Sequence, residues 1–170
     1  MAKTTQRGIE PSLPRLLGNT VVHSGGMAPP TTTTGTDVTP VVTETYICEV
    51  DLPHSMTLTG VKLLNGSAAA GNVTAYLYDA AGVPMAKSAS TAQSGTAAYQ
   101  TFAFSAPIKA PGPARYFIGV QFDSTSARFR SHILGNFIAG KKTGETYGTG
   151  TTITTSTFTT GLGPIADVYA

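Results

Sequence analysis

The sequence predicts an all-β fold, an antiparallel, jelly-roll-like β-sandwich of about eight strands with an extended N-terminal arm. The chain of 170 residues has 28 threonines but only four glutamates, so strand-favouring β-branched residues are abundant and surface helix formers are scarce. Glycine and proline recur between short apolar stretches, which is typical of short strands joined by turns. A chain of this length can bury one good hydrophobic core.

We expect residues 1–39 to form the arm and residues 40–170 the sandwich domain. Apolar residues are sparse in the arm, and Pro11, Pro14, Pro29 and Pro30 interrupt any helix or strand ladder. Roughly 37 extended residues reach on the order of 120 Å, whereas a domain of about 130 residues has a radius of gyration near 14 Å. Such an arm can lie on a neighbouring subunit; a disordered tail is the alternative.

Apolar and polar residues alternate from Pro40 onward, as in half-buried strands. Between residues 42 and 52, the expected core face consists of alternate residues: Val42, Glu44, Tyr46, Cys48, Val50 and Leu52. The threonine-rich stretch 149–160 reads as a long loop across a sheet or a neighbour. The expected strands lie at 42–52, 57–64, 72–79, 83–88, 99–104, 115–123, 127–132 and 165–169.

Composition excludes several classes of protein. A formal charge of +2 is too small for a nucleic-acid binder that neutralises many phosphates. No apolar run approaches the length of a membrane span, and the polar, basic start lacks the apolar region of a signal peptide. One cysteine forms no internal disulfide, and Cys48 and the three histidines lack zinc-ligand spacing. We therefore expect a protein of the cytosol, without nucleic-acid or membrane partners.

The sequence contains no motif for catalysis, so we predict no catalytic, cofactor-binding or metal-binding residue. Asp51, Asp79 and Asp123 lie at strand ends, where loop carboxylates can hold calcium, but without D-x-D spacing turn capping is favoured. The aromatic residues alternate along strands, which favours core packing over a sugar-stacking platform. Cys48 falls on an apolar strand face and reads as a small buried hydrophobe.

Two segments are candidates for contact with a partner. Arg128 and Arg130 alternate around Phe129 and predict a basic stripe for acidic groups of a partner, with a solvated sheet face as the alternative. In the arm, basic residues accompany three leucines that either form one short helical turn or act as three apolar anchors. The predicted partner-contact residues are Arg7, Leu13, Arg15, Leu16, Leu17, Arg128 and Arg130.

Four segments of the chain resemble β-sandwich structural proteins of tailed bacteriophages. They are residues 59–66 (TGVKLLNG), 75–82 (AYLYDAAG), 112–122 (GPARYFIGVQF) and 158–166 (FTTGLGPIA). The resemblance covers about residues 40–170 and leaves the arm unmatched. It implies a virion component without enzymatic activity, a capsid decoration or cement protein that bridges and stabilises neighbouring shell subunits. The implied partner is the major capsid protein or another virion protein, and the implied location is the virion, assembled in the host cytoplasm.

Low charge, the long threonine-rich loop and the far-reaching arm further predict a homotrimer or another cyclic oligomer. Two alternatives stay open. A tail or fibre receptor-binding module would expose an aromatic or acidic pocket for host glycan. A free carbohydrate-binding or adhesin domain would ordinarily carry a secretion signal. The place of the chain in purified particles distinguishes these hypotheses.

Overall fold

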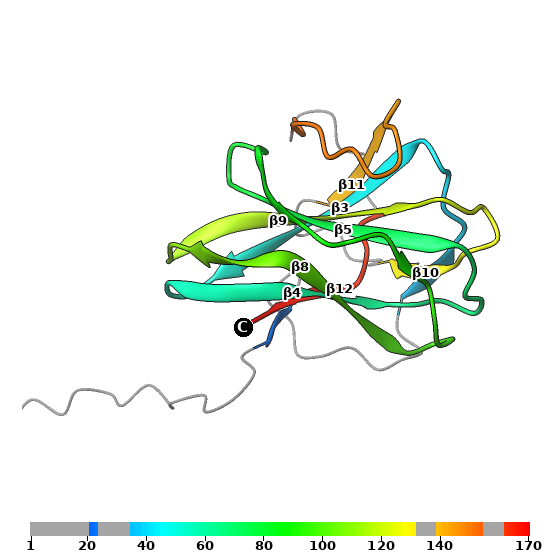
Figure 1. Cartoon of the computed structure of the whole chain (residues 1–170), viewed down its shortest axis with the longest axis horizontal. Helices are drawn as coiled ribbons and strands as arrows, with labels where there is room; N and C mark the ends of the chain where they lie inside the picture. The colour runs from blue at the N-terminus through cyan, green and yellow to red at the C-terminus, as the bar shows by residue number, and fades with distance from the viewer. Residues whose placement is uncertain (1–20, 24–34, 132–138, 155–161) are drawn as a thin grey trace, which may run out of the picture.

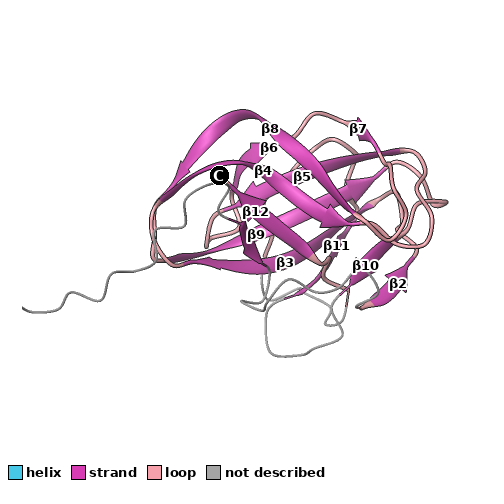
Figure 2. Ribbon diagram, turned by 90° about the horizontal axis from the view of Figure 1, so that it is seen from below, coloured by secondary structure: helices cyan, strands magenta, loops and turns pink. Residues whose placement is uncertain are grey.

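The computed structural model describes residues 21–23, 35–131, 139–154 and 162–170, and the regular structure in those ranges consists of strands alone (Figure 2). In these ranges, no helix has the length and apolar character needed to cross a bilayer. The strands are β1 (Val21–His23), β2 (Thr36–Val38), β3 (Glu44–Leu52), β4 (Met56–Leu64), β5 (Asn72–Tyr78), β6 (Pro84–Lys87), β7 (Thr91–Ala92), β8 (Tyr99–Ala110), β9 (Ala114–Phe122), β10 (Phe129–Ser131), β11 (Ala139–Thr143) and β12 (Ala166–Tyr169).

Two antiparallel sheets pack face to face and form the sandwich (Figure 1). The smaller sheet has the order β1-β12-β4-β8, and the larger has the order β11-β3-β9-β5-β6 with β7 paired to β5. A two-stranded sheet, β10-β2, forms its own ladder, and isolated bridges join Phe129 of β10 to Asn65 and Ser131 to Pro164. The predicted all-β antiparallel sandwich is thereby confirmed, while the jelly-roll connectivity stays a prediction.

The main core lies between the two sheets and is built by alternate residues of the long strands. Tyr46, Cys48, Val50 and Leu52 of β3 all belong to it, as the period-2 pattern predicts. Among its aromatic rings, the centroid of Phe129 lies 4.7 Å from that of Tyr46. Core packing of the aromatic residues and burial of Cys48 are thus confirmed.

Two short strands fall within residues 1–39, which the sequence analysis assigns to the arm. β1 pairs with β12, and β2 pairs with β10. Val38 at the end of β2 packs against the main core. Sheet structure therefore begins before residue 40, the expected start of the sandwich domain.

The eight expected segments each contain a strand, and four further strands occur in the described ranges: β1, β2, β7 and β11. β8 runs to Ala110, six residues beyond its expected end, although Pro107 lies inside it. Beyond Phe104, β8 pairs only with β4, so a residue without an N–H group is tolerated at this edge. The sequence of β11 contains Gly140 and two lysines and does not alternate between apolar and polar residues. It forms a strand because it pairs with β3.

Candidate interaction surface around strand β6

Only part of the predicted contact set falls in the described residues. The five predicted contact residues of the arm lie outside the described ranges: Arg7, Leu13, Arg15, Leu16 and Leu17. Arg128 directly precedes β10, and Arg130 lies in that strand. The structure thus places two of the seven residues, Arg128 and Arg130, and the side chains of both contact other groups of the same chain.

Arg130 lies beside Asp37 of the paired strand β2, with 3.8 Å between Arg130 Nε and Asp37 Oδ1. The Arg130 side chain is only 18% exposed. Arg128 Nη1 donates hydrogen bonds to the carbonyl oxygens of Thr125, at 3.2 Å, and Ala127, at 2.8 Å. Both guanidinium groups therefore contact groups of their own chain, and contact with an acidic partner stays a prediction.

Asp37 joins this arginine pair to a neighbouring loop. Its carboxylate accepts hydrogen bonds from the Ser67 amide, at 2.9 Å, and the Ser67 hydroxyl, at 2.5 Å. Burial by itself would raise the pKa of Asp37, but the hydrogen bonds from Ser67 and the positive charge of Arg130 lower it below the ordinary value. Asp37 consequently stays ionised and holds β2, β10 and the loop after β4 together.

Of the strand-end aspartates, Asp79 caps its turn, as predicted, whereas Asp123 makes a long-range hydrogen bond to the start of β5. Asp79 Oδ1 accepts hydrogen bonds from the amides of Ala81, at 2.9 Å, and Val83, at 2.8 Å. Asp123 Oδ1 accepts one from the Asn72 amide at 2.6 Å. Within the ranges that the structure describes, no three His, Cys, Asp or Glu side chains come together as a metal site.

Residues 144–154, which we call the strap, cross the outer face of the larger sheet. In Figure 1 this segment is drawn in orange above β3 and β11. Its start is fixed by the Glu145 amide, which donates to the carbonyl of Thr43 at 2.9 Å. Its far part is fixed by the Ile153 amide, which donates to the carbonyl of Gly82 at 2.9 Å. The predicted loop across a sheet is confirmed for residues 149–154; residues 155–161 lie outside the described ranges.

The strap covers a second, smaller apolar cluster on the outer face. Ile153 packs there with Ile47 of β3, Phe117 of β9, and Tyr76 and Tyr78 of β5. All five are at most 1% exposed. The strap lies so close that a Cβ atom on Gly150 would come within 2.6 Å of the Tyr76 ring. A face that a two-sheet sandwich would otherwise expose is therefore closed by the chain's own loop.

Gln121 of β9 provides the polar anchor of the strap. Its Oε1 accepts hydrogen bonds from the Tyr76 hydroxyl, at 3.0 Å, and the Gly148 amide, at 2.9 Å. Its Nε2 donates to Thr45 Oγ1, at 2.7 Å, and to the Thr149 carbonyl, at 3.2 Å. Since Gln121 is only 1% exposed, these four contacts satisfy an amide that has almost no access to water.

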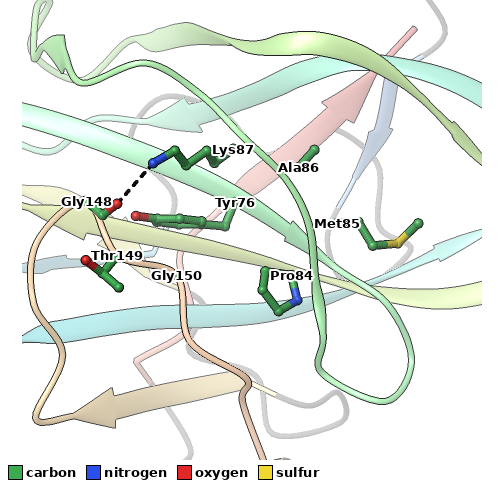
Figure 3. A pocket seen from close by; sticks show the side chains of 8 residues that line it. All are labelled: Tyr76, Pro84, Met85, Ala86, Lys87, Gly148, Thr149 and Gly150. Atoms are coloured by element: carbon green, nitrogen blue, oxygen red, sulfur yellow. Dashed lines mark hydrogen bonds between the residues drawn. The ribbon is translucent and has the colours of Figure 1, made fainter.

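Beside the strap, the surface has two hollows, one on each side of β6. The first, of about 460 Å³, lies between β6 and residues 148–150. Figure 3 shows the Tyr76 ring at the bottom of it and Lys87 reaching across, with Lys87 Nζ 3.3 Å from the Gly148 carbonyl oxygen. The second, of about 420 Å³, lies between β6 and residues 105–108 of β8. The two hollows share Met85, Ala86 and Lys87.

An apolar strip follows this edge of the sandwich, and we call it the seam. Val83 is 46% exposed and, with Val41, is one of the two large apolar residues of the described part that are exposed. Met85, Ala86 and Ile108 are partly buried and pack against the main core, so the core reaches the surface here. The seam consists of Val83, Pro84, Met85, Ala86, Ala106, Pro107 and Ile108.

The seam lies where the edge strands of the two sheets, β6 and β8, run side by side without a continuous ladder between them. They meet where Ser88 pairs with Phe104 and where the Ser105 hydroxyl donates to the Lys87 carbonyl at 3.3 Å. Beyond that point, no strand of the described residues pairs with the outer edge of β6. Leu77 pairs with Ala86 but the next residue of β5 pairs with Pro84, which leaves Met85 as the extra residue of a bulge.

Both edges are poor templates for an added strand. Pro84 and Pro107 lack an N–H group, and the bulge at Met85 breaks the regular spacing of donors and acceptors on β6. These two edges therefore offer side chains for packing rather than a regular backbone ladder for a further strand. Lys87 and Lys109, both exposed, flank the apolar residues. An exposed apolar strip with a polar rim is typical of a protein-binding surface.

Sequence analysis did not find this surface. Residues 83–88 and the end of β8 are far apart in the chain, and each is too short and too ordinary in composition to stand out. The available signal was a proline next to apolar residues in each segment, Pro84 and Pro107, since proline within a strand is typical of a sheet edge. Comparison of the chain with protein-family models, with curated proteins and with solved structures finds no match.

Proposed function

We propose that this chain is a non-enzymatic structural protein of a tailed-phage virion, a capsid decoration protein that bridges and stabilises neighbouring shell subunits. The observation that carries the proposal is the seam, where core residues such as Met85 and Ile108 reach the surface. A decoration protein needs a surface by which it adheres to other subunits, and the centre of such an interface is poor in charged residues, as the seam is. The resemblance of the sequence to β-sandwich proteins of tailed phages supports the virion as the assembly to which the chain adheres.

The receptor-binding alternative requires an aromatic face that a sugar can stack on. The hollow next to Tyr76 is the best candidate in the described part, since the ring forms its floor. However, Tyr76 is only 1% exposed, and Gly150 of the strap lies on its ring. The geometry therefore favours a packing surface for protein over a stacking platform for glycan.

The proposal is tested on particles. In purified virions of the phage that encodes this chain, we expect the protein on the shell, in a number comparable to that of the major capsid protein. Particles made without the protein should release their DNA at a lower temperature and after a milder osmotic shock, because a protein that binds only the assembled shell stabilises it.

Complementation with the wild-type protein is the control and should restore both thresholds. A chain found only at the tail tip would support the receptor-binding alternative instead. Particles that are equally robust with and without the protein would contradict the cement role, and absence of the chain from virions would contradict the proposal as a whole.

A further inference from the structure

We propose that Asn65 and Gly66 form a modification site that is inert in the folded protein and deamidates when the loops around it open. In deamidation, the backbone nitrogen of the residue after an asparagine attacks the carbonyl carbon of the asparagine side chain. Glycine in that following position hinders the attack least, because it has no side chain. This chemistry belongs to the chain itself and does not depend on the assembly role proposed above.

Packing requires the glycine of this pair. Gly66 follows β4 and lies against Asp37 of β2 and Arg128, which directly precedes β10. A Cβ atom on Gly66 would overlap the Asp37 carboxylate and come within 2.7 Å of Arg128 Cβ. A larger residue would therefore displace β2 or the start of β10.

Hydrogen bonding requires the asparagine. The Asn65 side chain is fully buried. Its Nδ2 donates to the Ser94 carbonyl at 2.7 Å and to Gln100 Oε1 at 3.0 Å. Its Oδ1 accepts a hydrogen bond from Gln93 Nε2 at 2.9 Å. These contacts join the end of β4 to the segment around the start of β8 and satisfy a carboxamide that has no access to water.

The same contacts block the reaction in the folded protein. The Gly66 amide donates its hydrogen to the Arg128 carbonyl at 2.9 Å, whereas attack requires that this nitrogen lose its proton and approach Asn65 Cγ. Gln93 restrains both reacting groups, because its Nε2 donates to Asn65 Oδ1 and also to the Arg128 carbonyl, at 2.8 Å. The reaction therefore has to wait until these loops separate.

Once the loops are open, water is the only further reactant that the chemistry needs. The Gly66 nitrogen gives up its proton and bonds to Asn65 Cγ, the Cγ–Nδ2 bond breaks, and ammonia leaves with that proton. Water then opens the cyclic imide at one of its two carbonyl carbons. The product is an aspartate, or an isoaspartate whose main chain runs through the β-carbon.

The product cannot rebuild the contacts of the amide. A carboxylate in its place would face two acceptors, the Ser94 carbonyl and Gln100 Oε1, and would keep only the donor of Gln93. Burial of a charge that lacks donors is costly. An isoaspartate in addition lengthens the main chain at the bridge that joins Asn65 to Phe129. An opening that lasts long enough for deamidation therefore becomes permanent.

The experiment incubates the full chain at mildly alkaline pH, in buffer and in guanidinium chloride, and follows deamidation by peptide mass spectrometry. We expect Asn65 to react at least about a hundredfold more slowly in the native protein, because only the open fraction reacts. Asn72, which precedes Val73, is the internal control and should stay an amide in both conditions, since a branched side chain hinders the attack. Equal rates at Asn65 in the two conditions would overturn the proposal.

Two matched variants separate opening of these loops from unfolding of the whole domain. Gln93→Ala should speed deamidation of native Asn65 at least about tenfold, because the side chain that restrains both reacting groups is gone. Gln121→Ala makes the same change at another buried glutamine, beneath the strap, and should leave the rate within about twofold of the wild type. An unchanged rate in Gln93→Ala, or equal acceleration in both variants, would overturn the proposal.

Far-UV circular dichroism verifies that the variants fold. Should Gln93→Ala fail to fold, Gln100→Ala takes its place. That variant removes the acceptor of Asn65 Nδ2 and is expected to accelerate the reaction in the same way.

Refolding tests whether the modification is permanent in its effect. Chain that has been partly deamidated in guanidinium chloride is diluted into buffer, and the native fraction is isolated by size-exclusion chromatography. We expect mass spectrometry to find Asn65 as the amide in this fraction. Deamidated chain that is recovered there, with the unfolding midpoint of the unmodified protein, would overturn the proposal.

Discussion

Gln121 is the residue through which the strap is joined to the sheet beneath it. Its amide contacts β3, β5 and the strap at the same time, through Thr45, Tyr76, and the backbone of Gly148 and Thr149. A buried amide that makes four hydrogen bonds fixes a single arrangement of its neighbours, because any shift leaves a buried donor or acceptor unpaired.

Replacing Gln121 by alanine should lower the free energy of unfolding by about 2 to 4 kcal/mol. The substitution leaves the Tyr76 hydroxyl and the Gly148 amide without the acceptor they share, and each unpaired buried group costs about 1–3 kcal/mol. Urea unfolding followed by circular dichroism measures the change. Thr101→Ala, at an exposed position of β8, is the control and should stay within about 0.5 kcal/mol. Equal stability of the two variants would contradict this role of Gln121.

The strap is the element that changes a two-sheet sandwich into a molecule with a second, covered face. It is held by Gln121, by the ion pair between Lys142 and Glu145, whose Nζ and Oε1 lie 2.9 Å apart, and by Ile153. Gly82 makes this approach feasible. A Cβ atom there would lie 2.1 Å from the Ile153 carbonyl oxygen, and its φ of +80° favours glycine.

Substituting Ile153 by alanine should loosen the strap without unfolding the sandwich. Ile153 is the strap's contribution to the outer apolar cluster, and loss of a fully buried isoleucine costs about 2–5 kcal/mol. We expect faster hydrogen exchange at the Gly148 and Ile153 amides, with exchange in β3 and β9 little changed, since their main core is on the other face. Thr152→Ala, at an exposed neighbour, should exchange like the wild type. Uniformly faster exchange throughout the sandwich would argue against a separately stabilised strap.

At the scale of the whole molecule, the buried tyrosines give stability a dependence on alkaline pH. Tyr46, Tyr76 and Tyr78 are at most 2% exposed. Burial raises the pKa of each above its ordinary value of 10.0, and for Tyr46 the hydrogen bond to Glu44 raises the pKa further. The unfolded chain therefore releases these protons at a lower pH than the native protein does.

Stability should consequently fall as the pH rises above about 10, because deprotonation then favours the unfolded chain. Three tyrosines together give a slope of up to about 4 kcal/mol per pH unit. Urea unfolding at pH 9, 10 and 11, with phenolate absorbance recorded in parallel, measures it. Tyr78→Phe should reduce the slope by up to about 1.4 kcal/mol per pH unit while leaving stability at neutral pH nearly unchanged, since the buried Tyr78 hydroxyl has no hydrogen-bond partner in the described part. A free energy of unfolding that is constant from pH 9 to 11 would refute the prediction.

The all-β class and most strands could be predicted because alternation is a local property of the chain. In β3, the residues from Tyr46 to Leu52 on the predicted face all enter the main core. The weaker predictions concern segments whose structure depends on a distant partner. β11 becomes a strand only because β3 lies beside it, and β2 is ordered by β10 although both are short.

The sequence by itself therefore determined the class of the fold, the inward faces of its long strands and the turn capped by Asp79, since these depend on neighbours within a few residues. The tertiary structure alone decided the covering of Tyr76 and Phe117 by the strap, the pairing of Arg130 with Asp37, and the seam. Each of these joins segments far apart in the chain. The seam in addition depends on how the edge strands of two sheets come to lie beside each other, a property of sheet packing that no alternation of residues along one strand can encode.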